Sequence, residues 1–478
     1  MRLLIHEQHV SPEVYFMNSK YSLWALSWPI FLELFLQTLL GTVDTVMVSH
    51  ISDDAVGVVG FANQLFNALN TLFMTVAAGA GILVAQRIGM RREEDARTIA
   101  VMAVSACLGI GMLLSVVLYC FSTPIAGLLN VSDDLLPLWN VYVSNLGGGM
   151  FLTAVIAVLG TVIRNTGNTQ GPMYIGVGMN VVHIALNYGF IYGAFGLPAL
   201  GLYGVTVSGN VSKLLAAAVL LYMFVYAFER RVQLRDFRVF HTGLFREILK
   251  IGWPLGVNMS CWVFSQLAIY AFLADLGDKE LAARTYMNAL ESFCFMLGGA
   301  IAAAAQIQIA HLYGAGKFRE AYWAAYRALG VGFLFVAASS ALLYAFGRPA
   351  LGFFTKDPEI VAMGVSLLAL NLLLQPGKML NMALGNALSA VGDTRFLMLI
   401  SLGSMAIIAT FCSYWLGLEL GWGLIGIYCC MIADEYVRGV LSYFRWRGQK
   451  RLRTRTQSTE PAARGLEPAI HAKSRISL

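Results

Sequence analysis

The stretch that opens with Trp28-Pro29 and runs to Gly189 recurs once, opening with Trp253-Pro254, at a constant offset of 225 residues. Chance matches would scatter over many offsets, whereas the matching pairs share this one without a gap. They are Asn63 and Asn288, Tyr119 and Tyr344, Phe121 and Phe346, Pro124 and Pro349, Gly127 and Gly352, Gly167 and Gly392, and Thr169 and Thr394. A duplicated chain has a natural place for a ligand at the interface between its halves.

The composition is that of a helical membrane protein. Hydrophobic residues make up 58% and charged residues 13% of the chain, and the mean hydropathy is +0.66. Soluble domains have roughly 45–50% and 25%. The seven cysteines form no metal-binding or redox pattern. Membrane-enzyme signatures are also absent from the sequence, so it does not predict an enzyme or a bound cofactor.

Twelve apolar stretches without strand-like alternation predict twelve transmembrane helices, six in each half. They lie near 24–48, 56–86, 98–122, 138–163, 172–195, 203–227, 251–275, 281–311, 325–347, 361–387, 397–418 and 423–444. Because six is even, both halves cross the membrane in the same sense. The expected fold is an all-α integral membrane protein with two six-helix bundles in a parallel repeat.

Lys and Arg gather in the loop after the second stretch, in the segment between the halves and in the C-terminal tail. The positive-inside rule therefore places both termini in the cytoplasm, and we expect a multi-pass protein of the bacterial inner membrane. The net charge of +6 reflects this asymmetry and does not indicate nucleic-acid binding. The expected divisions are a cytoplasmic N-terminal segment (1–22), an N-lobe (23–227), a cytoplasmic linker (228–250), a C-lobe (251–445) and a disordered basic tail (446–478).

Polar side chains inside the spans are costly, and they usually face a cavity or a partner. In the first half they line single helix faces, and they are Glu33, Gln37 and Asp44, then Asn63, Asn67 and Asn70, then Asn180, His183 and Asn187. Asp44, Asn63 and Asn187 lie at similar depths, counted from the outer loops. The alternatives are that Asp44 ends its helix and that the amides and the histidine only join helices.

The second half has different polar residues in the same frame. Asp44 corresponds to Ile269, whereas Glu291 and Lys378 introduce opposite charges about midway along two spans. Asn288 accompanies Glu291, and the helix of Lys378 also carries Asn371, Gln375 and Asn381. Glu291 and Lys378 are expected to pair, either as a structural ion pair or as part of the transport mechanism.

These residues resemble the multidrug and toxic compound extrusion (MATE) family over about residues 20–445. The likeness rests on Trp28-Pro29, on the stretch from Gln37 to Met47 that contains Asp44, and on the duplicated frame. It continues in the small residues of 77–89, in the Gly-Asn-Thr and Gly-Asp-Thr turns, and in Asn187-Tyr188. The resemblance implies two lobes in a V shape around a central cavity. It also implies efflux of organic, often cationic, compounds against H⁺ or Na⁺, with Asp44 at the family's carboxylate of the first span.

The chain departs from the family in two places. Many members have Asp where this chain has Asn187, although some have Asn as here. Another branch has acidic residues at the positions of Trp262 and Lys378, so its cation site in the C-lobe does not carry over.

The resulting expectation is an antiporter that exports organic cationic or amphipathic compounds by alternating access between the lobes, with a flippase for lipid-linked precursors as the alternative. The expected partners are the substrate and membrane lipid, and the protein is expected to be a monomer. The candidates for cation coupling are Asp44, Asn187, His183, Asn63 and Asn180. The candidates for the substrate cavity are Glu33, Gln37, Asn67, Glu291, Lys378 and Gln375. H⁺ is favoured because no second acid lies near Asp44, and Na⁺ at Asp44 is the alternative.

Overall fold

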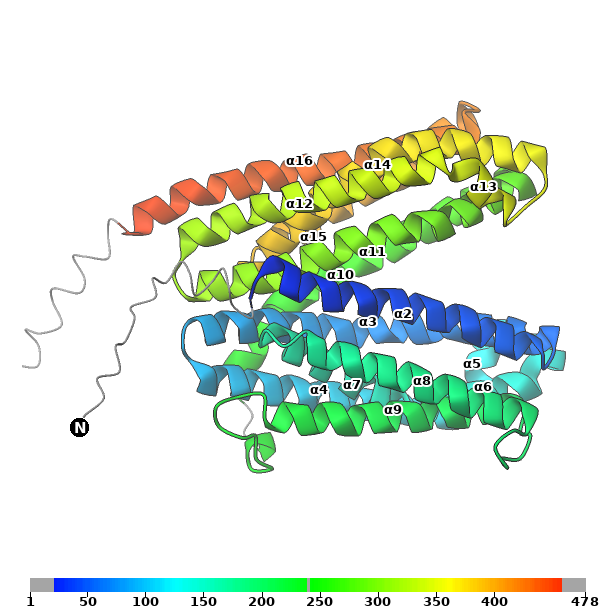
Figure 1. Ribbon diagram of the computed structural model, residues 1–478, viewed down its shortest axis with the longest axis horizontal. Helices are drawn as coiled ribbons and strands as arrows, with labels where there is room; N and C mark the ends of the chain where they lie inside the picture. The colour runs from blue at the N-terminus through cyan, green and yellow to red at the C-terminus, as the bar shows by residue number, and fades with distance from the viewer. Residues whose placement is uncertain (1–20, 239–240, 458–478) are drawn as a thin grey trace, which may run out of the picture.

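The computed structural model describes residues 21–238 and 241–457, and it is built from helices (Figure 1). In the first half they are α2 (Leu23–Ser49), α3 (Asp53–Gly89), α4 (Glu93–Cys120), α5 (Ser122–Leu128), α6 (Leu136–Gly148), α7 (Met150–Asn165), α8 (Gln170–Tyr192) and α9 (Leu202–Val225). In the second half they are α10 (Thr242–Leu276), α11 (Asp278–Gly314), α12 (Phe318–Ala345), α13 (Gly347–Gly352), α14 (Pro358–Ala390), α15 (Thr394–Ser404) and α16 (Gly423–Gln457).

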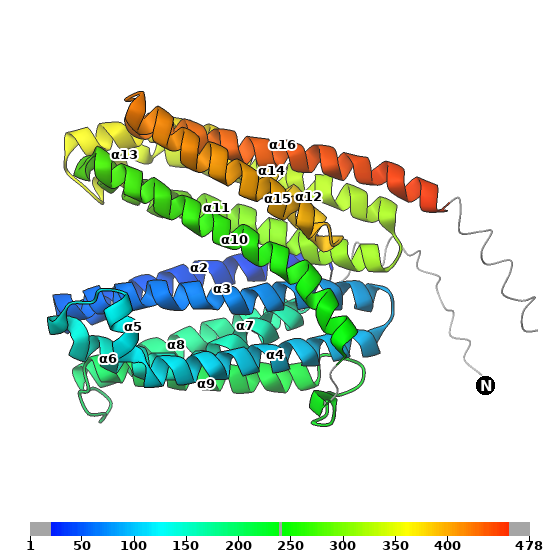
Figure 2. The same ribbon diagram turned by 180° about the vertical axis from the view of Figure 1, so that it is seen from behind.

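The expected all-α membrane fold is confirmed. Ten of the described helices are long and apolar enough to cross a membrane, or eleven if α6 and α7, which meet at 43°, form one bent span. The twelfth expected span lies in α16, whose middle carries Asp434, Glu435 and Arg438. Both acids pair with Arg438. The helix is therefore less apolar than the others, although it lies along the C-lobe bundle (Figure 2).

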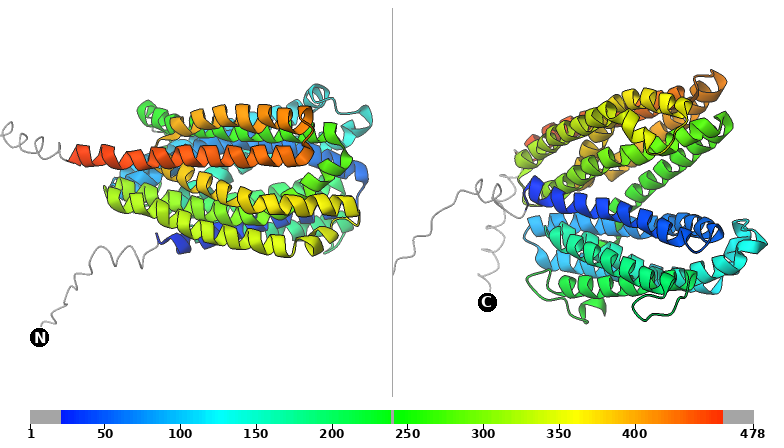
Figure 3. Two further views of the ribbon diagram at one scale, coloured as in Figure 1. Left: turned by 90° about the horizontal axis from the view of Figure 1, so that it is seen from above. Right: turned by 45° about the vertical axis from the view of Figure 1, so that its right-hand side comes forward.

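The helices form two bundles that correspond to the two halves of the sequence. The N-lobe contains α2 to α9 and the C-lobe contains α10 to α16 (Figures 1 and 2). The bundles lie closest at the end where α3 meets α4 and where α16 leaves the C-lobe, and they diverge toward the other end (Figure 3). We call the first end the basic end, after Arg87, Arg91, Arg92, Arg445 and Arg447.

The two lobes contact each other through two helix pairs that the internal repeat makes equivalent. Helix α3 of the N-lobe packs on α10 of the C-lobe so closely that a Cβ atom at Gly79 would lie 2.4 Å from the carbonyl oxygen of Ile248. Helix α11 of the C-lobe packs on α2 of the N-lobe, where Leu26 and Ile30 are buried against Ala304. Because α11 repeats α3 and α10 repeats α2, these two contacts are related by the internal repeat.

Four features differ from a plain set of twelve straight spans. The fourth expected span bends between α6 and α7, and α15 continues as a π-helix over Met405–Cys412. The helix α10 begins at Thr242, inside the expected linker. The helix α16 continues to Gln457, so residues 446–457 are helical rather than disordered as the sequence predicted. Residues 458–478 of that tail, and most of the N-terminal segment (1–20), lie outside the described residues.

The Gly-Asn-Thr and Gly-Asp-Thr turns have the same backbone conformation, which explains why glycine recurs at Gly167 and Gly392. Gly167 and Gly392 both have a left-handed backbone, with φ of 90° and 85°. Alanine at either position is expected to cost about 1–2 kcal/mol for this conformation alone. At Gly167 the added Cβ would also lie 2.4 Å from Cε1 of Tyr21, whereas at Gly392 it would lie 4.0 Å from Cδ1 of Ile251.

Gly167→Ala should therefore lower the free energy of unfolding more than Gly392→Ala, measured by denaturant titration of the purified protein. Equal losses would show that Tyr21 moves aside without cost.

Candidate functional site

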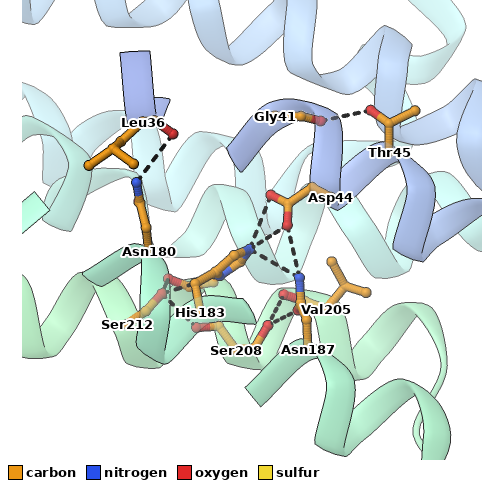
Figure 4. A network of polar contacts seen from close by, with 11 residues as sticks. Leu36, Gly41, Asp44, Thr45, Asn180, His183, Asn187, Val205, Ser208 and Ser212 are labelled. Atoms are coloured by element: carbon orange, nitrogen blue, oxygen red, sulfur yellow. Dashed lines mark hydrogen bonds and ion pairs between the residues drawn. The ribbon is translucent and has the colours of Figure 1, made fainter. Parts of the chain in front are cut away.

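Asp44 lies in the C-terminal part of α2, where α8 approaches it from the side (Figure 4). Nε2 of His183 is 3.0 Å from Oδ1 and 3.1 Å from Oδ2 of Asp44. The side-chain amide of Asn187 donates to Oδ1 of Asp44 at 3.1 Å. His183 and Asn187 are one helical turn apart on α8, so one face of that helix holds both partners of the carboxylate.

Two serines of α9 support these partners from behind. Oγ of Ser208 donates to Oδ1 of Asn187, and Oγ of Ser212 lies 3.3 Å from Nδ1 of His183 (Figure 4). Ser212 also donates to the carbonyl oxygen of Ser208 at 2.8 Å. We call Asp44, His183, Asn187, Ser208 and Ser212 the N-lobe network. The sequence did not predict the serines, because periodicity does not tell which neighbouring helix packs behind a polar face.

The N-lobe network is buried on one side and open on the other. The side chain of Asp44 is 29% exposed, whereas that of His183 is 11% exposed and Asn187 is fully buried. Lys213 follows Ser212 on α9, and its ammonium group is within electrostatic reach of Asp44. The carboxylate can therefore meet a solute while its partners stay fixed.

The other coupling candidates lie elsewhere. Asn180 donates to the backbone oxygen of Leu36 at 3.4 Å and so ties α8 to α2. Among the described residues, Asn63 is exposed on α3 and is not a member of the N-lobe network. Three of the five candidates, Asp44, His183 and Asn187, are thus brought together.

Glu33 makes an ion pair that the sequence did not predict. Nη1 of Arg164 lies 2.6 and 2.8 Å from its two carboxylate oxygens, and this arginine belongs to α7. Arg164 was not among the predicted residues because it falls just after the expected end of the fourth span. Gln37 and Asn67, also expected in the cavity, are exposed on α2 and α3.

Glu291 and Lys378 meet, with Nζ 3.3 Å from Oε2. Arg284 adds a second cation 3.4 Å from the same oxygen, and the hydroxyl of Tyr428 donates to Oε1 at 3.0 Å. Gln375 donates to Asn371 at 2.9 Å on the same helix as Lys378. Arg284 and Tyr428 had no signal in the sequence beyond their polarity near a span end. The acid thus has two basic partners rather than one.

A second charged cluster occupies the C-lobe near the position that corresponds to Asp44. Asp434 and Glu435 both pair with Arg438, and Ser404 of α15 donates to Asp434 at 2.6 Å. A cavity of about 20 Å³ lies between this cluster and Ile269, the counterpart of Asp44. Next to the counterpart of Asp44, the C-lobe thus has acids on its last helix, α16, whereas the N-lobe has Asp44 on its first helix, α2.

A family model described as MatE matches residues 29–189 and 254–415, the two halves of the repeat. The chain belongs to the MATE family. It is 32% identical over 432 residues to an uncharacterized transporter of Bacillus subtilis, YisQ, covering 90% of this chain and 95% of that one. It is 25% identical to the multidrug resistance protein PmpM of Pseudomonas aeruginosa, covering 84% and 83% of the two chains.

Solved MATE structures have the same fold. A MATE protein in the bent conformation matches with a TM-score of 0.83 and 19% identity, over 91% of this chain and 96% of that one. An outward-facing multidrug resistance MATE transporter matches with a TM-score of 0.81, 19% identity and the same coverage. The resemblance noted in the sequence is thereby confirmed, and the chain is a multi-pass membrane transporter of the MATE family.

Proposed function

We propose that this MATE protein exports organic cationic or amphipathic compounds in exchange for H⁺, and that Asp44 and His183 hold the exchanged proton. The observation that carries the proposal is the contact of one imidazole nitrogen, Nε2, with both oxygens of a partly exposed carboxylate at 3.0 and 3.1 Å. The name of the related PmpM, a multidrug resistance protein, supports small organic substrates.

The bonding pattern around His183 supports one shared proton. Oγ of Ser212 donates to the carbonyl oxygen of Ser208, so it can accept a hydrogen bond from Nδ1 of His183, and this arrangement favours the tautomer with a hydrogen on Nδ1. Nε2 then carries a second hydrogen that faces the carboxylate, accepts one from protonated Asp44, or accepts one from the side-chain amide of Asn187, whose nitrogen lies 3.1 Å away. In the first two forms one exchangeable proton lies between Asp44 and His183, and the third is the form that has released it. Removing it leaves a lone pair against a carboxylate, which weakens their contact.

The same surroundings suit Na⁺ less well. Na⁺ is a hard cation that prefers several oxygen ligands. The hydrogen-bonding partners of the Asp44 carboxylate in the described structure are nitrogens of His183 and Asn187, and the amide oxygen of Asn187 accepts from Ser208. These surroundings support H⁺ rather than Na⁺ as the exchanged ion.

Exchange follows from charge. A substrate cation that approaches the exposed side of Asp44 competes with the proton for one negative charge, so binding of either releases the other. The lobes alternate between openings at opposite ends. The basic end faces the cytoplasm of a bacterial cell, in accord with the positive-inside rule.

The test uses purified protein in liposomes and ethidium, a fluorescent organic cation. An imposed pH gradient in Na⁺-free buffer is expected to drive ethidium movement. A Na⁺ gradient at equal pH is expected to drive none. Transport that needs Na⁺ and ignores the pH gradient would overturn the proposal, and protein-free liposomes give the background.

A further inference from the structure

Gln86 and His311 occupy equivalent positions in the two halves and make equivalent bonds across the lobe interface. Nε2 of Gln86, on α3, donates to the carbonyl oxygen of Ala390 at 2.7 Å. Nε2 of His311, on α11, lies 2.7 Å from the carbonyl oxygen of Asn165. Ala390 ends α14 and Asn165 ends α7, and both pairs obey the offset of 225 residues. Each lobe thus bonds to the end of a helix in the other.

The backbones at this place touch in the same reciprocal way. A Cβ atom at Gly89 would lie 2.2 Å from the carbonyl oxygen of His311, and one at Gly314 would lie 2.0 Å from that of Gln86. Gly89 and Gly314 are again equivalent by the repeat. Their missing side chains let α3 and α11 approach closely enough for both bonds to form.

All four residues lie near the last turns of α3 and α11, at the basic end where the lobes are closest (Figure 3). Gln86 is 8% exposed and His311 is 4% exposed, so neither bond is solvated in this state. The centroid of the Tyr21 ring lies 4.3 Å from that of the His311 ring, so Tyr21 packs against the side chain that makes the second bond. Separation of the lobes at the basic end would break both bonds at once.

We propose that Gln86, His311, Gly89 and Gly314 form a two-fold latch that holds the basic end closed, and that each transport cycle breaks and remakes its two bonds. The proposal rests on the alternating access of the proposed function. Gln86 and His311 are positioning residues, since they set which end is open without touching the N-lobe network. When the latch opens, water forms hydrogen bonds with the freed groups, so the net energy of each bond is modest and opening is reversible.

The side chains differ but their chemistry matches. Glutamine and histidine both present an Nε2 donor to a backbone carbonyl, so His311→Gln keeps the bond and makes the latch chemically symmetric. His311→Ala and Gln86→Ala each remove one arm. Gly89→Ala instead wedges the backbones apart. Gly109→Ala is the matched control, because that helical glycine has no atom within 4 Å of its added Cβ.

Hydrogen–deuterium exchange of the purified full-length protein, read by mass spectrometry without substrate, tests the latch. The double variant Gln86→Ala/His311→Ala is expected to raise exchange about tenfold at the ends of α3, α7, α11 and α14, and not at the opposite end. Gly89→Ala should raise exchange at the same ends. His311→Gln and Gly109→Ala should match the unmodified protein.

Unchanged exchange in the double variant would overturn the latch, and so would a rise spread evenly over all helices, which indicates a purely structural role. If the double variant does not fold, Gln86→Ala and Gly89→Ala carry the same expectation. Exchange needs no ion gradient, so its result stands whether or not the proton coupling of Asp44 holds. Transport kinetics add a second readout, in which Gly89→Ala lowers the maximal ethidium rate while Gly109→Ala does not.

Discussion

Asp44→Asn is expected to reduce ethidium transport driven by a pH gradient to the level of protein-free liposomes. Asparagine has nearly the same shape, and its side-chain oxygen still accepts from Asn187, which donates at 3.1 Å. It carries no charge, so it can neither hold a proton against His183 nor exchange one for a cation. The free energy of unfolding should change by no more than about 1–2 kcal/mol. Initial rates in liposomes and denaturant titration of the same preparation measure the two effects.

Asp53→Asn is the matched control, because it makes the same chemical change at an exposed residue in the first turn of α3. It is expected to transport at the normal rate. Normal transport by Asp44→Asn would remove Asp44 from the coupling mechanism. Loss of transport together with a large loss of stability would mean that Asp44 is needed for folding instead.

The largest loss of stability is expected from Glu291→Gln. This change leaves Arg284 and Lys378, at 3.4 and 3.3 Å from the former carboxylate, without their shared anion. Breaking a buried pair in this way costs about 3–5 kcal/mol. Lys378→Met should cost less, because Glu291 keeps Arg284 and the hydroxyl of Tyr428. Denaturant titration of both purified variants compares the losses.

A double-mutant cycle of Glu291→Gln and Lys378→Met separates the pair from its surroundings. The double variant should lose less stability than the sum of the single losses, since it lacks both charges of one pair. Additive losses would show that the two side chains do not interact. A cycle that couples in transport rates but not in stability would place Lys378 in the mechanism.

The arrangement of spans was predictable because hydropathy and the internal repeat can both be read directly from the sequence. The first span was expected over 24–48 and α2 covers Leu23–Ser49. The bend after Gly148 was not predicted, although three consecutive glycines, 147–149, mark it in the sequence. The continuation of α16 to Gln457 was missed because a charged helix beyond the membrane has no apolar period.

The candidate site was predictable only in part, because periodicity places a side chain on a helix face but does not tell which helix packs against that face. Asp44, His183 and Asn187 could be grouped from their depth and spacing, and they meet. Asn63 lies at a similar depth on α3, yet α9 rather than α3 supports the partners of Asp44. The ion pair of Glu33 with Arg164 joins α2 to α7, and a contact between such distant segments has no local signal.

The most direct test of the shared proton is proton release on substrate binding. Purified protein in weakly buffered detergent solution, with a pH indicator, is titrated with ethidium while its fluorescence reports binding. The unmodified protein is expected to release up to about one proton per ethidium bound, and Asp44→Asn is expected to release none. Ethidium that binds to the unmodified protein without proton release, and that Na⁺ displaces, would contradict proton exchange at Asp44 and His183.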